Sequence, residues 1–197
     1  MNMGVSETNI KLVPNGIDFS EYQCLPQKGQ FRGKFNINNK EKIVLFLGRI
    51  HEIKGIDMLI EAFSLITKEY SNVKLVIAGP DDGYLSIIKN QIDNLRIHDK
   101  VFFTGPIYGQ DKITAYIDAD IYVLPSRDDM FPNTVLEAFA CSTPVVVSKR
   151  CGIYEFVKNV CYGVNFDSNE LKDAILALLK DSDLRARLGR EGRELVM

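Results

Sequence analysis

The stretch DIYVLPSRDDMFPNTVLEAFACSTPVVVS, residues 120–148, decides the fold. Two short apolar runs, at 120–126 and 143–148, are rich in β-branched and aromatic residues and predict strands. Between them lie a polar loop and a segment, 132–141, whose apolar residues recur at helical spacing. A helix that joins two successive strands is the usual crossover of a parallel sheet. The stretch therefore predicts one unit of a parallel α/β fold.

The same alternation of strand and helix recurs along the chain. Further strands are predicted at 42–48, 73–79 and 101–105. Further helices are predicted at 56–70, 82–95, 111–119 and 152–158, and as a pair over 168–195 with a break near 181–183. Because parallel strands need crossover connections, the pattern predicts an α/β fold with a Rossmann-like parallel sheet and helices on both faces.

Composition narrows the class of protein. The chain has 197 residues, 46% hydrophobic and 25% charged, which is enough for one globular domain with a substantial core. A formal net charge of −2 gives no basic field for nucleic acid, so no nucleic-acid partner is expected. No apolar run reaches the roughly 18 residues of a membrane span. The four cysteines form no C-x-x-C pair, which favours reduced, inert thiols in a cytoplasmic protein.

Residues 1–39 differ from the rest of the chain. They are rich in Gly, Pro and Asn and contain at most one edge strand, at 10–14, and a short helix near 31–35. We expect them to form an entry or linker segment packed on the domain, and residues 40–197 to form the Rossmann-like domain itself.

In open parallel sheets, ligands bind outside the carboxyl ends of the strands. Arg49 and Lys54 follow the first strand of the domain and precede a helix, so both are expected at that edge. Two cations there can clamp a phosphate, Arg49 as a fork and Lys54 as a mobile point charge. The alternative is a pair of solvated surface charges.

Two carboxylates, Asp129 and Glu137, flank the start of the helix in the opening stretch. Pro132 suits a first helical position, which predicts a helix from Pro132 to Cys141 with free amides at its start. Acids there can simply cap the helix or interact with its dipole. Beside a phosphate-binding pair, they can also accept hydrogen bonds from sugar hydroxyls. A ligand with central phosphates and hydroxyls at both ends is a nucleotide sugar.

Four motifs, in order, resemble the donor-binding C-terminal domain of the GT-B retaining glycosyltransferases of family 4 (glycosyl transferases group 1). They are VPNGID at 13–18, FLGRIHEIKG at 46–55, LVIAGPDDG at 75–83 and the segment 125–148. The resemblance implies that residues 40–197 bind a nucleotide sugar.

The resemblance also implies a role for each candidate residue. Arg49 and Lys54 would bind the diphosphate, Glu137 the ribose and Asp129 the donor hexose, which makes Asp129 and Glu137 the candidate catalytic residues. The backbone of the loop and helix start would contact phosphate or sugar, at Met130, Phe131, Pro132 and Asn133. The sequence departs from the family pattern at Asp129, where Glu is usual, and at Met130 and Pro132, where Gly is usual.

The implied reaction is transfer of a hexose from a nucleoside diphosphate sugar, with retention, to a glycan or lipid-linked acceptor. The resemblance implies no tightly bound cofactor and no metal, and a cytoplasmic enzyme that can sit peripherally at the inner face of the membrane. The family carries an acceptor domain before VPNGID, and about a dozen residues precede that motif here. We therefore expect an isolated donor domain that binds donor without turnover.

Two other classes of function remain open. One is another GT-B enzyme, such as a nucleotide-sugar epimerase or a sugar phosphorylase. The other is a non-catalytic nucleotide-binding or interaction module. Two D-x-D patterns, at 118–120 and 181–183, resemble the metal-binding pattern of a different glycosyltransferase fold. We expect the first to lie at the amino edge of the sheet and the second to cap a helix.

Overall fold

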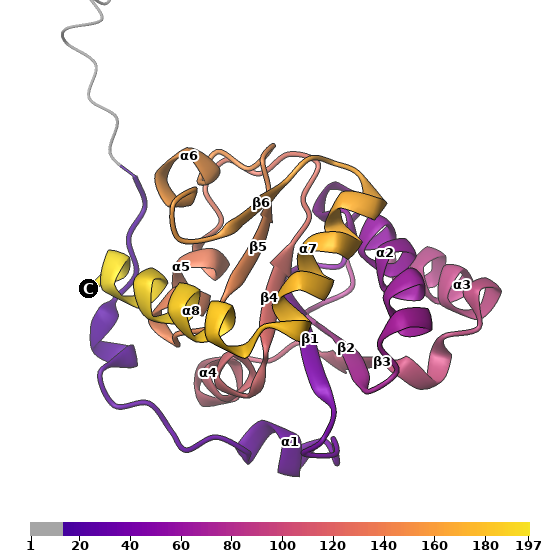
Figure 1. The fold of residues 1–197 in the computed structure, drawn as a ribbon, viewed down its shortest axis with the longest axis horizontal. Coiled ribbons are helices and arrows are strands. Elements are labelled where there is room, and N and C mark those ends of the chain that lie inside the picture. The colour runs from indigo at the N-terminus through magenta and orange to yellow at the C-terminus, as the bar shows by residue number, and fades with distance from the viewer. Residues whose placement is uncertain (1–13) are drawn as a thin grey trace, which may run out of the picture.

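The computed structural model describes residues 14–197, and six parallel strands form its single sheet in the order β3-β2-β1-β4-β5-β6 (Figure 1). The strands are β1 Lys42–Leu47, β2 Val73–Ala78, β3 Val101–Gly105, β4 Ile121–Leu124, β5 Val145–Ser148 and β6 Tyr162–Val164. The predicted fold class is confirmed. Because the chain order reverses between β1 and β4, a crevice is expected where their carboxyl ends meet.

Helices connect the strands and cover both faces. They are α1 Gln30–Lys34, α2 Ile56–Glu69, α3 Leu85–Leu95, α4 Gly109–Asp118, α5 Asn133–Ala140, α6 Tyr154–Val157, α7 Ser168–Lys180 and α8 Ser182–Val196. From β1 to β3 the chain moves across the sheet toward one side, through α2 and α3, and from β3 to β5 it moves toward the other side, through α4 and α5. Because crossovers are right-handed, α2 and α3 lie on one face of the sheet and α4 and α5 on the other. In Figure 1, α2 and α3 lie together on one side and α4 on the other; α7 packs on α2, and α8 packs on α5.

The central strands are buried on both faces, as their continuous apolar runs require. The five residues Ile43–Leu47 of β1 are buried, and all of β4 and β5 is buried. The segment before β1 also enters the core, through Tyr22, 2% exposed, and Phe31, 1% exposed. Helix α1 confirms the short helix expected near residue 31. Positions 10–13 of the edge strand expected at 10–14 lie outside the described residues.

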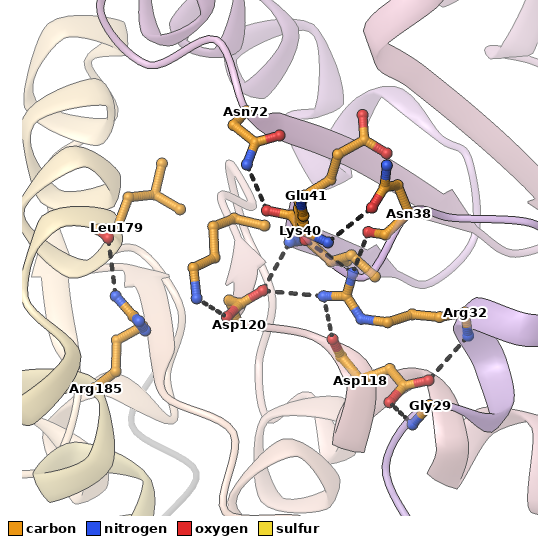
Figure 2. Close-up of polar contacts among 12 residues, drawn as sticks. Gly29, Arg32, Asn38, Lys40, Glu41, Asn72, Asp118, Asp120, Leu179 and Arg185 are labelled. Carbon is orange, nitrogen blue, oxygen red and sulfur yellow. Dashed lines mark hydrogen bonds and ion pairs between the residues drawn. The ribbon is translucent and has the colours of Figure 1, made fainter.

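A buried arginine ties α1 to the amino edge of the sheet (Figure 2). The Arg32 side chain is 6% exposed and donates hydrogen bonds to the carbonyls of Asn38, Glu41 and Asp118. It also forms an ion pair of 3.2 Å with Asp120. Both terminal nitrogens of the guanidinium are thus hydrogen-bonded within the fold, which marks this cluster as structural.

The first D-x-D pattern belongs to the same cluster. Asp118 accepts hydrogen bonds from the amides of Gly29 and Arg32, and Asp120 accepts from the Ile43 amide and the Lys42 ammonium. Both carboxylates lie at the amino edge, as expected. In the second pattern, Asp181 caps α8 by accepting from the amides of residues 183 and 184, which confirms the predicted helix cap and break.

Two elements differ from the sequence-based expectation. Strand β6 was not predicted, because three residues are too few to show a period. Helix α5 begins at Asn133 and ends at Ala140, so the predicted start at Pro132 is wrong by one residue: Pro132 has extended backbone angles, φ −73° and ψ 113°.

Within residues 14–197, no helix is long and apolar enough to span a membrane. In the same range, no group of three His, Cys, Asp or Glu side chains is arranged as metal ligands are.

Candidate functional site

A pocket of about 290 Å³ opens where the carboxyl ends of the central strands meet. Its floor is backbone, because Gly48 and Gly79 follow β1 and β2 and lie against each other. A Cβ atom on Gly79, whose φ is +144°, would lie 1.8 Å from the Gly48 carbonyl oxygen. The lining is Leu47, Gly48, Arg49, Gly79, Pro80, Ile107, Tyr108, Lys112, Thr134 and Glu137. Two predicted site residues, Arg49 and Glu137, therefore share one pocket.

Arg49 lies at the solvent side of this pocket. Its side chain is 61% exposed, and Nη1 lies 2.5 Å from an Asp82 carboxylate oxygen. A surface ion pair of this kind contributes little to stability, so the guanidinium is free to reorient toward a ligand.

Lys54 and Asp129, predicted to contact different parts of a ligand, lie in contact with each other. The Lys54 Nζ is 2.5 Å from Asp129 Oδ2, and the side chains are 17% and 15% exposed. Lys54 is the last residue of a short 3₁₀ helix, and Gly55, whose φ is +67°, follows it as the C-cap. A Cβ atom on Gly55 would lie 2.1 Å from the Pro125 carbonyl oxygen. This close approach brings Lys54 to the loop that carries Asp129.

The loop from Pro125 to Phe131 is fixed at several points. The Arg127 amide donates to the Ile53 carbonyl, and its guanidinium pairs with both oxygens of Asp57, at 2.8 and 2.5 Å. Further along, the Asp129 carbonyl accepts from the Gly152 amide at 2.8 Å. Asp129 is therefore held on a well-anchored loop at the same edge of the sheet as Lys54.

Glu137 points from α5 toward α4, where both of its carboxylate oxygens have partners. Oε1 lies 2.7 Å from the Lys112 ammonium, and Oε2 accepts from the Tyr116 hydroxyl at 3.0 Å. Burial, together with the charge of Glu137, raises the pKa of Tyr116 well above its ordinary value, so the phenol keeps its proton. The Glu137 side chain remains 13% exposed, at the pocket wall.

The segment from Met130 to Asn133 leads into α5. Met130 is 84% exposed, and the Phe131 ring packs edge-on against Phe156 with centroids 5.5 Å apart. Pro132 is buried, whereas Asn133, the first residue of α5, lines a second pocket of about 260 Å³ that also contains Glu137. The free amides at the start of α5 give this edge a positive partial charge.

Sequence reasoning missed Lys112 and Tyr116. Both lie on α4, and the strand order places that helix beside α5. The available signal was their spacing of four residues, which puts them on one face of a helix. Nothing in the spacing says that this face turns toward Glu137.

Comparisons with known proteins agree with the architecture. Residues 27–195 match the family described as glycosyl transferases group 1. An uncharacterized glycosyltransferase of Methanocaldococcus jannaschii is 37% identical over 163 residues, which cover 80% of this chain and 41% of that protein. Alpha-monoglucosyldiacylglycerol synthase of Streptococcus pneumoniae is 32% identical over 180 residues, covering 88% of this chain and 41% of the synthase.

Among solved structures, Anabaena HepE in complex with UDP superposes with a TM-score of 0.88. It is 22% identical and is matched over 98% of this chain and 54% of its own, so the likeness concerns the fold. The chain thus spans about two fifths of the length of the two curated relatives and about half of HepE.

Proposed function

Since the chain belongs to the glycosyl transferases group 1 family, we propose that it binds the donor of a retaining glycosyltransferase. The donor is a nucleoside diphosphate hexose, and the whole protein transfers the hexose to a glycan or lipid-linked acceptor. The name of the pneumococcal relative, a glucosyldiacylglycerol synthase, supports a lipid acceptor. UDP in the HepE complex supports a nucleoside diphosphate as the leaving group.

One observation carries the proposal: Arg49 and Glu137 line a single pocket at the carboxyl edge, the edge that also carries the ion pair of Lys54 and Asp129. Their common pocket supports a role for Arg49 on the phosphate and for Glu137 on the ribose of one ligand. In this proposal Lys54 binds the diphosphate with Arg49, and Asp129 accepts a hydrogen bond from the hexose. The backbone from Met130 to Asn133 contacts phosphate or sugar.

The arrangement suits departure of a diphosphate. The acceptor oxygen bonds to the anomeric carbon, the bond from that carbon to the β-phosphate oxygen breaks, and its electron pair leaves with the diphosphate. Arg49, Lys54 and the amino end of α5 stabilise the charge that develops there. Retention places the acceptor on the face from which the diphosphate departs. In this proposal the acceptor proton passes to an oxygen of the departing diphosphate.

Calorimetric titration tests the proposal. The chain is titrated with UDP, GDP and ADP and with the corresponding nucleosides. At least one diphosphate should bind more tightly than its nucleoside, because each charged contact contributes about 1.5 to 3 kcal/mol. Arg49→Ala and Lys54→Ala should each lower the affinity for the diphosphate by roughly 10- to 150-fold. Each should lower the affinity for the nucleoside far less.

Arg187→Ala is the matched control, because Arg187 also forms an exposed ion pair, with Glu191 at 3.2 Å, on α8. It should leave both affinities unchanged. If no diphosphate binds, the chain is an interaction module and the proposal is wrong. If either substitution weakens nucleoside and diphosphate equally, the phosphate assignment is wrong.

A further inference from the structure

Among the described residues, 14–197, Lys112 is the cation closest to Glu137, and the sequence analysis assigned it no role. Its Nζ lies 2.7 Å from Glu137 Oε1, and its side chain is 22% exposed. It lies in the first turns of α4, the helix that packs beside α5. Lys112 and Glu137 together line both the 290 Å³ pocket and the 260 Å³ pocket, so the pair stands between the two.

The contacts on Glu137 leave part of its carboxylate open. A carboxylate offers about four lone-pair directions, and Lys112 and Tyr116 occupy one on each oxygen. Two directions remain, which matches the two vicinal hydroxyls of a ribose. Because each oxygen has its own donor, the plane of the carboxylate is fixed in advance of binding.

The two donors are of different kinds. Tyr116 is fully buried, and its raised pKa keeps the hydroxyl protonated, so it is a fixed neutral donor. Lys112 carries a positive charge and three N–H groups, and within residues 14–197 Glu137 is its one hydrogen-bond partner. Loss of the ammonium would leave a largely buried carboxylate with one neutral donor and with one oxygen free of any partner that fixes it.

On this basis we propose that Lys112 is a positioning residue that sets Glu137 for recognition of the 2′- and 3′-hydroxyls of the nucleotide. The proposal rests on the proposed function, since it assigns the ribose to Glu137. It makes the preference for ribonucleotides over their dideoxy analogues a property of the Lys112 and Glu137 pair.

The test compares affinities for UDP and 2′,3′-dideoxy-UDP, or for GDP or ADP with its own dideoxy analogue if that base binds better. Each affinity is measured for the parent chain, Lys112→Met and Lys112→Arg. We expect the parent to prefer the ribonucleotide by at least tenfold. Lys112→Met should reduce this ratio by about tenfold, since a charged hydrogen bond is involved, and Lys112→Arg should restore most of it.

Lys34→Met is the matched control. Lys34 also pairs with a carboxylate, Asp111, at 2.7 Å, but 53% of its side chain is exposed and it lies on α1. This variant should keep the parent ratio. Tyr116→Phe retains the buried ring and removes the second donor, so it should lower the ratio in the same direction as Lys112→Met, by a smaller factor.

The outcomes separate the two proposals. If Lys112→Met weakens both ligands equally, or only lowers the melting temperature, Lys112 is structural and the inference is overturned while donor binding stands. The inference is likewise overturned if the ratio of the two affinities is unchanged in both Lys112→Met and Tyr116→Phe. If no diphosphate binds the parent chain, the proposed function fails and this inference fails with it.

Discussion

Lys54 and Asp129 partly neutralise each other at the carboxyl edge of the sheet. Their charged atoms lie 2.5 Å apart and both side chains are largely sheltered from solvent. Any phosphate that binds Lys54 also approaches the negative charge of Asp129. The sequence alone suggests that Asp129→Asn would leave the free diphosphate unaffected. The ion pair changes this expectation, because removal of the carboxylate leaves Lys54 without its competitor.

We predict that Asp129→Asn tightens binding of the free nucleoside diphosphate by a few-fold and weakens the nucleotide sugar by about tenfold. The free diphosphate binds more tightly because its repulsion by the Asp129 carboxylate is removed. The nucleotide sugar binds more weakly because one charged hydrogen bond to the sugar is lost. Titration with UDP and UDP-glucose, or the equivalent ligands of the preferred base, measures both. Glu137→Gln should instead weaken both ligands, because ribose is common to them.

Asp111→Asn serves as the control for this prediction, since Asp111 pairs with Lys34 in an exposed position. It should change neither affinity. A drop in melting temperature for Asp129→Asn and Glu137→Gln, with ligand preference preserved, would show that the two acids serve only the helix and loop.

At the scale of elements, each edge of the sheet has its own polar cluster. The carboxyl edge carries the candidate site, in which Arg49 and Glu137 line one pocket. At the amino edge, Arg32 is enclosed by carbonyls and by Asp120, and it joins α1 to the end of α4 and the start of β4 (Figure 2). In our proposal, the same residue types thus serve binding at the carboxyl edge and stability at the amino edge.

We predict that Arg32→Met destabilises the fold by about 3 to 5 kcal/mol, because it removes one partner of a buried charge pair and leaves carbonyls without donors. Urea unfolding measures the change in free energy. Nucleotide affinity should be unchanged, since the cluster lies at the opposite edge from the pocket.

The comparison variant is Lys34→Met, which removes a half-exposed ion pair from the same helix. It should cost about 1 kcal/mol or less. If Arg32→Met cost no more than Lys34→Met, the buried network would not be what anchors α1.

At the scale of the whole molecule, one core buries three of the four cysteines. Burial raises the pKa of Cys141, Cys151 and Cys161 to about 12 each, against an ordinary value of 9.0. Cys24 alone is exposed. The buried thiols therefore stay protonated and unreactive in the folded chain, as the sequence predicts for inert cysteines.

We predict that stability falls as pH rises above 9. The unfolded thiols lose their protons near pH 9 while the folded ones retain theirs, so the unfolded state binds fewer protons and is favoured. The loss approaches about 1.4 kcal/mol per pH unit for each thiol. Urea unfolding between pH 8.5 and 9.75 measures it below the ordinary tyrosine pKa of 10.0.

Cys161→Ala isolates one thiol, because burial alone raises its pKa. This variant should show roughly three quarters of the parent slope, because two buried thiols remain and the tyrosines whose pKa is raised also contribute as the pH nears 9.75. A slope equal to that of the parent would contradict the assignment of the alkaline loss to buried thiols.

The sequence by itself determined the alternation of elements, the parallel sheet and the edge at which the candidate site lies. Apolar runs and helical spacing are local signals, and parallel strands always bring their carboxyl ends to one edge. This was enough to place Arg49 at the carboxyl edge and Asp129 and Glu137 around the start of α5. It was not enough for β6, whose three residues carry no period.

Only the tertiary structure decided which charges meet. Strand order puts β1 beside β4, which brings Lys54 against Asp129, 75 positions later in the chain, and α4 beside α5, which brings Lys112 against Glu137. Such pairings depend on which elements pack side by side and how each is rotated about its axis. Local periodicity specifies the buried face of an element, whereas its neighbour is chosen by the packing of the whole chain.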